Sequence, residues 1–183
     1  KEIRDELLVF KKSPLYTYRT ENKYFPVVGE GSHQAAIIFI GEAPGKNESE
    51  QGRPFVGESG KVLDNIITAC GWKREDLFIT NVVRCRPPEN RIPTKDEIKN
   101  CDEHLQDIID LVNPKFILLL GATAATAVLG MPLNLVRGTI SDYKDKKVFV
   151  TYHPSFALRQ GNSAKKQIWE DLQSLIKIMK DFL

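Results

Sequence analysis

Apolar residues occur along this chain in two patterns that follow one another. Short continuous apolar runs, typical of strands buried on both faces, are separated by stretches in which apolar residues recur at helical spacing. The predicted strands are residues 35–40, 77–83, 115–120 and 147–152. Alternating strands and helices favour a parallel sheet with helices on both faces. We therefore expect an α/β fold, with a single three-layer α/β/α domain around a central, mostly parallel four-stranded sheet.

The predicted helices carry their own boundary signals. One ends at Gly71, and another begins with the capping box of residues 94–97. Further helices are expected at residues 2–9, 122–129 and 164–182. With 183 residues and 42% hydrophobic content, the chain is expected to form one domain over residues 1–183. We assign residues 1–30 to an N-terminal helix and rim segment, and residues 35–183 to the α/β core.

Four polar segments lie at or near the ends of the predicted strands. They are GEAPGKNE at residues 41–48, GRPFVG at 52–57, ITNVVRCRPP at 79–88 and HPSFALR at 153–159. The carboxyl ends of parallel strands form the edge at which open α/β sheets bind ligands, and glycines there allow close approach of the backbone. The four segments are therefore expected to surround one pocket.

In this order, the four segments resemble the motifs of the uracil-DNA glycosylase superfamily. Glu42 in the first motif makes the fourth family of that superfamily the most similar, and the resemblance extends from about Ser13 to the C-terminus. It implies a DNA repair enzyme that flips uracil out of deaminated DNA, hydrolyses its N-glycosidic bond and releases free uracil, leaving an abasic site. The expected partner is uracil-containing DNA, bound by a monomer.

Two side chains are expected to support bond cleavage. By resemblance, His153 lies near uracil O2, where an imidazole stabilises the negative charge of the departing base. Glu42 faces the sugar, where its carboxylate stabilises positive charge, orients the attacking water, or does both. The other two histidines are weaker candidates, because His33 precedes the first strand and His104 is expected to be solvated in mid-helix.

Base recognition is assigned to the first three motifs. Phe55 offers a face for stacking, unless it is a loop residue buried in the core. Asn81 offers an amide that accepts from N3–H and donates to O4 of uracil, a pattern that cytosine reverses; the alternative is an ordinary strand-end Asn. Glu48 is expected near uracil C5, where it helps to exclude the methyl group of thymine. Close backbone contacts are assigned to Gly41, Ala43 and Gly45.

Contacts to the DNA backbone are expected from basic residues beside these motifs. The net charge of +2 is too small to indicate nucleic-acid binding by itself. Two clusters flank the predicted ligand loops: Arg84, Arg86 and Arg91, and Arg159, Lys165 and Lys166. Phosphate contacts are favoured for the arginines, with solvated surface charge as the alternative. By resemblance, Ser155 and Arg159 hold phosphates, while Leu158 either enters the duplex as a wedge or packs against Phe156.

The cysteines depart from the family pattern. Fourth-family enzymes usually hold a [4Fe–4S] cluster with four cysteines, of which Cys85 and Cys101 match the second pair. Phe10 and Ser13 stand where the first pair would be, and Cys70 is expected on a buried helix face. We therefore expect no cluster, no other metal and no cofactor. Cys85 and Cys101 are either free thiols or a disulfide.

Other functions stay open. One is a cluster-less superfamily member that removes hypoxanthine, xanthine or mismatched thymine, and another is an inactive protein that binds damaged DNA. Asn81 and Glu48 argue against the first, and the presence of Glu42, Asn81 and His153 together argues against the second. A generic nucleotide-binding protein is the weakest alternative, because the chain has neither a Gly-x-Gly-x-x-Gly nor a Walker motif. No membrane span or signal peptide is evident, so a cytoplasmic location is expected.

Overall fold

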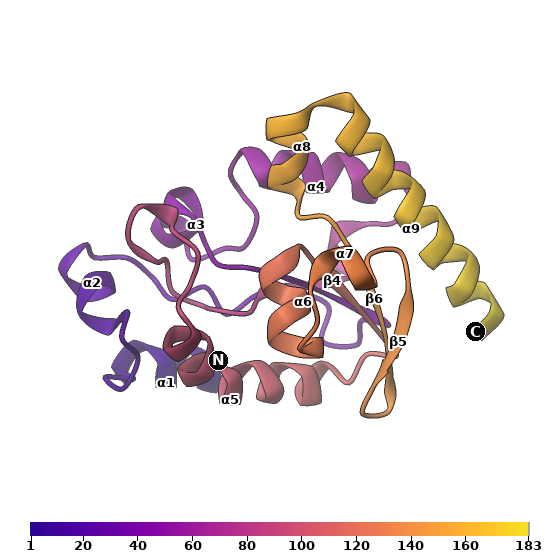
Figure 1. Cartoon of the computed structure of the whole chain (residues 1–183). Helices are drawn as coiled ribbons and strands as arrows, with labels where there is room; N and C mark the ends of the chain where they lie inside the picture. Colours follow the sequence, from indigo (N-terminus) through magenta and orange to yellow (C-terminus); the bar gives the residue numbers. More distant parts are fainter. Residues whose placement is uncertain (183) are drawn as a thin grey trace.

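The apolar runs of the sequence form the centre of a six-stranded sheet in the computed structural model, which describes residues 1–182 (Figure 1). The strand order is β1-β3-β2-β4-β6-β5. The strands are β1 (Glu30–Gly31), β2 (Ile37–Gly41), β3 (Phe78–Asn81), β4 (Phe116–Leu120), β5 (Ile140–Tyr143) and β6 (Lys146–Thr151). The four inner strands, β3, β2, β4 and β6, are mutually parallel. The expected three-layer, mostly parallel α/β fold is therefore confirmed.

The predicted number of strands is wrong, because each edge of the sheet carries one more. The two-residue strand β1 pairs antiparallel with β3, and β5 pairs antiparallel with β6. Neither forms a continuous apolar run, since every residue of β1 is half-buried and β5 alternates between exposed and half-buried positions. An edge strand that is covered on one side lacks the pattern from which the central strands were predicted.

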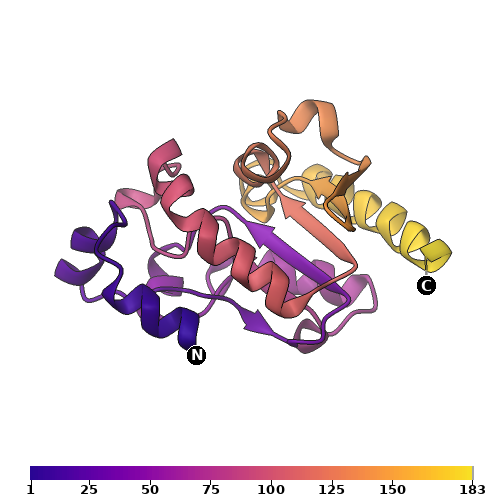
Figure 2. The same ribbon diagram turned by 90° about the horizontal axis from the view of Figure 1, so that it is seen from below.

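Helices cover both faces of the sheet (Figures 1 and 2). They are α1 (Glu2–Val9), α2 (Tyr16–Glu21), α3 (Lys46–Gln51), α4 (Glu58–Ala69), α5 (Lys95–Val112), α6 (Ala122–Leu129), α7 (Leu133–Val136), α8 (Pro154–Gln160) and α9 (Asn162–Phe182). Two short 3₁₀ turns, η1 (Arg74–Asp76) and η2 (Pro88–Asn90), lie in the connections. Within the described chain, no helix combines the length and the apolarity that a membrane span needs.

Successive residues of the central strands point into two different cores. On β2, Ile38 and Ile40 pack with α5 and α6, whereas Ile37 and Phe39 pack with α4, α8 and α9. All five residues of β2 are buried for this reason, and the same holds for β4. Two filled cores fix the register of the inner strands, because a shift by one residue would exchange the two sets of side chains.

The capping box predicted at residues 94–97 is confirmed. The hydroxyl of Thr94 accepts a hydrogen bond from the backbone N–H of Glu97 at 3.2 Å, and the Glu97 carboxylate accepts one from the Thr94 N–H at 2.9 Å. The C-cap of α5 is Asn113, whose φ of 47° is left-handed. Both ends of α5 are thus determined by local residues.

The expectation that Arg84 contacts a DNA phosphate is wrong. Its side chain is fully buried and donates hydrogen bonds to the carbonyl oxygens of Asn81 and Val82, each at 2.8 Å, and to that of Cys101. Burial lowers the pKa of this guanidinium, although the nearby cysteines oppose that shift. Arg84 is therefore a structural residue that ties the end of β3 to α5.

His104 was predicted to be solvated, and that prediction is wrong. The side chain is buried, with its ring 5.1 Å from the ring of Phe10 in an edge-on arrangement. Its Nε2 lies 3.4 Å from a carboxylate oxygen of Glu6. His104 thus faces α1 and the segment after it, which a helical pattern in α5 alone cannot reveal.

The three cysteines of the described chain are free thiols. Burial, together with the neighbouring Cys101, raises the pKa of Cys85 to about 12. Cys70 is the C-cap of α4 and is only half-buried, so the expectation of a buried helix-face position is corrected. Its pKa is raised to about 11 by desolvation. All of these shifts disfavour the reactive thiolate form.

We expect Arg84→Met to destabilise the fold by about 3 kcal/mol, because three carbonyl oxygens lose the hydrogen bonds that the buried guanidinium donates. Arg4→Met, at an exposed position of α1, should change the free energy of unfolding by less than about 0.5 kcal/mol. Urea unfolding of both variants measures the difference. Equal stability of the two would show that Arg84 does not link β3 to α5.

Candidate active site

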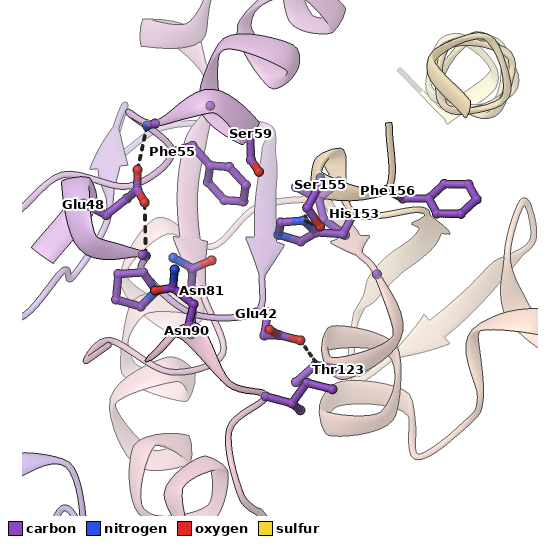
Figure 3. A pocket seen from close by; sticks show the side chains of 18 of the residues that line it. Glu42, Glu48, Phe55, Ser59, Asn81, Asn90, Thr123, His153, Ser155 and Phe156 are labelled. Atoms are coloured by element: carbon purple, nitrogen blue, oxygen red, sulfur yellow. Dashed lines mark hydrogen bonds between the residues drawn. The ribbon is translucent and has the colours of Figure 1, made fainter. Parts of the chain in front are cut away.

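A cleft of about 760 Å³ lies at the carboxyl edge of the parallel strands (Figure 3). Segments that follow β2, β3, β4 and β6 supply its walls, as expected for an open α/β sheet. The predicted site residues in its lining are Glu42, Ala43, Gly45, Glu48, Phe55, Asn81, His153, Ser155 and Arg159. Gly41, Arg86 and Leu158 lie outside the lining. The roles assigned to these residues stay predictions, but most of them share one cavity.

Asn81 ends β3 inside this cleft. The residue is only 2% exposed, and no described residue donates a hydrogen bond to its Oδ1. The paired residue on β2 is Gly41, where an added Cβ would lie 2.6 Å from Asn81 Oδ1 and 2.6 Å from the Phe55 ring. A glycine is therefore required beneath the amide. A buried acceptor without a donor is costly, so this atom is suited to receive a ligand or water N–H or O–H.

Phe55 forms another wall of the cleft in a constrained backbone conformation. Its φ is +50°, a left-handed value that is unusual for an aromatic residue. The residue is 6% exposed, and its ring centroid lies 5.6 Å from that of the His153 ring, with 31° between the planes. The next helix, α4, approaches so closely that a Cβ at Gly60 would lie 1.9 Å from the Phe55 carbonyl oxygen. Backbone strain of this kind persists only where the surroundings enforce it.

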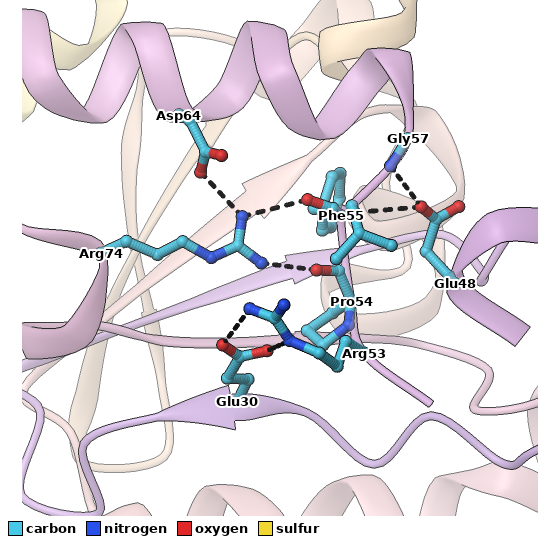
Figure 4. Close-up of polar contacts among 9 residues, drawn as sticks. Glu30, Glu48, Arg53, Pro54, Phe55, Gly57, Asp64 and Arg74 are labelled. Carbon is cyan, nitrogen blue, oxygen red and sulfur yellow. Dashed lines mark hydrogen bonds and ion pairs between the residues drawn. The ribbon is translucent and has the colours of Figure 1, made fainter. Parts of the chain in front are cut away.

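Two charged side chains enforce the Phe55 conformation (Figure 4). The Glu48 carboxylate accepts backbone hydrogen bonds from Gly45 at 3.1 Å, Val56 at 3.0 Å and Gly57 at 2.7 Å. Arg74 donates to the carbonyl oxygens of Pro54 at 2.5 Å and Phe55 at 3.0 Å. Glu48 thus holds the loop by its N–H groups, and Arg74 holds it by its carbonyl groups. We call these two residues the Phe55 clamp.

His153 begins α8 as its N-cap and enters the cleft from the opposite side (Figure 3). Its Nδ1 accepts a hydrogen bond from the Ser155 N–H at 3.1 Å and lies 2.8 Å from the Ser155 hydroxyl. With Nδ1 as acceptor, the proton of the neutral ring is on Nε2. Desolvation of the ring, followed by the charge of Arg159, lowers the pKa of His153 to about 4. The imidazole is therefore neutral at pH 7.

Glu42 follows β2 directly and lies at the base of the cleft as it is drawn in Figure 3. One carboxylate oxygen, Oε2, accepts a hydrogen bond from the hydroxyl of Thr123. Thr123 belongs to the first turn of α6, which begins immediately after β4. The N-cap of that helix is Gly121, where a Cβ would lie 2.8 Å from the Cβ of His153. The start of α6 therefore contacts both predicted catalytic side chains.

Of the residues predicted to contact the DNA backbone, Ser155 and Arg159 line the cleft, whereas Arg86 lies outside its lining. Arg86 donates to Asn90 Oδ1 at 2.7 Å and to the Tyr24 hydroxyl at 2.9 Å. Arg159 reaches the Ser155 hydroxyl at 3.4 Å. Leu158 is 48% exposed on α8, whereas Phe156 stacks on Tyr152 with 4.3 Å between ring centroids. Leu158 is thus exposed and lies outside the cleft lining, and its assignment as a wedge stays a prediction.

Two residues of this arrangement were not predicted from the sequence. Thr123 and Arg74 lie outside the four motifs, and each acts through a partner distant in the chain. Thr123 carries a detectable signal, because it is the first hydroxyl residue after the strand at 115–120 and so belongs to the same sheet edge. Arg74 carries none, since a lone arginine in a charged loop is typical of solvated surface.

The residues that replace the first cysteine pair do not fit an iron–sulfur cluster. Phe10 packs on His104, and the Ser13 hydroxyl accepts a hydrogen bond from the Leu15 N–H at 3.2 Å. Within residues 1–182, no three His, Cys, Asp or Glu side chains are grouped so that they could hold a metal ion.

Comparison with known proteins defines the family. The sequence profile described as "Uracil DNA glycosylase superfamily" matches residues 28–173, and this chain belongs to that superfamily. It is 41% identical to a type-4 uracil-DNA glycosylase of Sulfurisphaera tokodaii over 95% of this chain and 82% of that protein. The corresponding enzyme of Thermotoga maritima is 40% identical over 91% of this chain and 88% of its own length. A type-5 uracil-DNA glycosylase of Pyrobaculum aerophilum is 30% identical over 71% and 66% respectively.

We expect Glu48→Gln to loosen the Phe55 loop, because an amide has one acceptor oxygen and would place N–H groups against backbone donors. Hydrogen exchange at the amides of Val56 and Gly57 should accelerate at least about tenfold, which corresponds to about 1.4 kcal/mol. Glu50→Gln, at an exposed position of the same helix, is the control and should leave both amides unchanged. Unchanged exchange in Glu48→Gln would show that the carboxylate does not hold the loop.

Proposed function

We propose that this chain is a monofunctional uracil-DNA glycosylase that removes uracil from deaminated DNA and leaves an abasic site. The observation that carries the proposal is the buried Oδ1 of Asn81, which has no donor among the described residues, beside the ring of Phe55. Figure 3 shows Phe55, Asn81 and His153 around one space, with Glu42 below it. Relatives at about 40% identity bear that enzyme's name, which supports the same activity here.

The proposed base recognition uses one face and one edge of uracil. The base stacks on Phe55, and the Asn81 amide accepts from N3–H and donates to O4. Cytosine presents the opposite pattern and would leave both buried groups unpaired, a penalty that can discriminate by about 10⁴. Glu48 cannot be a free carboxylate in this pocket, since both of its oxygens are bonded to the backbone. Exclusion of the thymine methyl group by Glu48 is thus proposed as a steric effect.

In the proposed mechanism, two side chains each stabilise one of the opposite charges that develop in the transition state. The bond between C1′ and N1 breaks, and its electron pair leaves with uracil, whose O2 is stabilised by the Nε2–H of neutral His153. A neutral donor suffices because uracil departs as an anion. The water oxygen forms the new bond to C1′, and its proton passes to Glu42, which also stabilises the cationic sugar.

Contacts outside the pocket would hold the distorted duplex. We assign Leu158 to the gap that the flipped nucleotide leaves, and Ser155, Arg159 and Arg86 to the phosphates beside it. The exposure of Leu158 and the position of Ser155 and Arg159 in the cleft lining support this assignment. The enzyme is proposed to act as a monomer in the cytoplasm and without a cofactor.

The test is a labelled duplex with one uracil opposite guanine, incubated with the protein and then treated with alkali to cleave abasic sites. Uracil-dependent cleavage supports the proposal. Parallel duplexes with hypoxanthine, xanthine or mismatched thymine test altered base specificity. Binding to uracil DNA without any cleavage would instead identify an inactive damage-binding protein.

We expect Asn81→Asp to slow uracil excision by about 10- to 100-fold, because the buried hydrogen bonds would be mispaired. A carboxylic acid can donate or accept, so measurable excision of cytosine should appear. The two excision rates, measured on otherwise identical duplexes, give the change in preference. Full retention of uracil selectivity would remove Asn81 from the role of base reader.

We also propose that the protein carries no iron–sulfur cluster. The aerobically purified protein should be colourless and contain far less than one iron per chain, because Phe10 and Ser13 cannot supply two thiolates. Iron and sulfide assays, repeated on protein prepared without oxygen, measure this. About four irons per chain in the anaerobic preparation would contradict it.

A further inference from the structure

The catalytic carboxylate assigned to Glu42 has a single hydrogen-bond partner in the part of the chain that the structure describes. That partner is the hydroxyl of Thr123, which donates to Oε2 (Figure 3). The two residues are 81 positions apart in the sequence and come from different strand ends. Thr123 lies in the cleft lining but outside the four sequence motifs. Its hydroxyl therefore meets Glu42 because β2 and β4 are paired, not because the residues are neighbours in the chain.

Backbone hydrogen bonds hold the chain around Glu42, but they do not fix the rotamer of its side chain. The Gly41 and Glu42 carbonyl oxygens accept hydrogen bonds from Val82 at 2.9 Å and Val83 at 3.1 Å. A free glutamate side chain still has several rotamers, and fixing them costs up to about 2 kcal/mol. Threonine is suited to supply the fixed point, because its branched Cβ restricts χ1 and its hydroxyl has one proton to donate.

We propose that Thr123 is a positioning residue for the glycosylase reaction. Its hydroxyl holds Oε2 of Glu42, so that Oε1 faces the sugar and the attacking water. The inference rests on the proposed catalytic role of Glu42. Thr123 touches neither the base nor the reacting atoms, and its contribution is the orientation of the carboxylate before the transition state forms.

Three variants separate this role from a purely structural one. Thr123→Val keeps the shape and removes the hydroxyl, Thr123→Ser keeps the hydroxyl, and Thr126→Val removes an exposed hydroxyl from the same helix. Single-turnover excision of uracil should be about 10- to 100-fold slower in Thr123→Val, within about threefold of the unaltered protein in Thr123→Ser, and unchanged in Thr126→Val. Affinity for a duplex with uncleavable 2′-fluorodeoxyuridine should change less than about twofold in all three, because the defect concerns orientation and not binding.

A double-mutant cycle with Glu42→Ala then shows whether Thr123 acts through the carboxylate. Thr123→Val should cause no further loss of rate in the Glu42→Ala background. An additional loss of the same size there, or equal loss in Thr123→Ser, would overturn the inference while leaving Glu42 catalytic. If Glu42→Ala itself retains activity within a few-fold, the proposed role of Glu42 fails, and the positioning role of Thr123 fails with it.

Discussion

The parallel pairing of β2 with β3 sets the geometry on which the rest of the site depends. Its register places Gly41 opposite Asn81, and a side chain at position 41 would collide with both the amide and the Phe55 ring at 2.6 Å. The same sheet brings the ends of β4 and β6 to this edge, so that α6 and α8 begin beside the cleft. The two filled cores make this register stable, because a one-residue slip would turn apolar side chains out of both.

Strand pairing alone cannot hold the loop that carries Phe55. That loop has a left-handed residue at its centre and depends on the Phe55 clamp. In the clamp, Glu48 accepts hydrogen bonds from backbone N–H groups and Arg74 donates hydrogen bonds to carbonyl groups. Charged groups are suited to this task, because their hydrogen bonds to the backbone are about twice as strong as neutral ones. The sheet thus fixes the base of the cleft, and the charged side chains of Glu48 and Arg74 hold one of its walls in a strained backbone conformation.

Features that depend on neighbouring residues were predictable from the sequence, and features that depend on distant partners were not. The central strands and the α5 capping box follow from apolar runs and from four adjacent residues. The edge strand β5, the buried Arg84 and the buried His104 were missed because their surroundings come from other elements. Four ordered motifs led to most of the cleft lining, while Arg74 and Thr123 were found only when strands and loops were placed in space.

Recognition of uracil through Asn81 and His153, in one pocket at the sheet edge, is what we propose. Its most direct test is a nuclear magnetic resonance titration of the ¹⁵N-labelled protein with free uracil, followed at the Asn81 side-chain amide and the His153 ring nitrogens. Saturable shifts of both signals with uracil, and none with cytosine at the same concentrations, are the predicted result. Shifts confined to residues away from the cleft, or equal shifts with both bases, would contradict the claim.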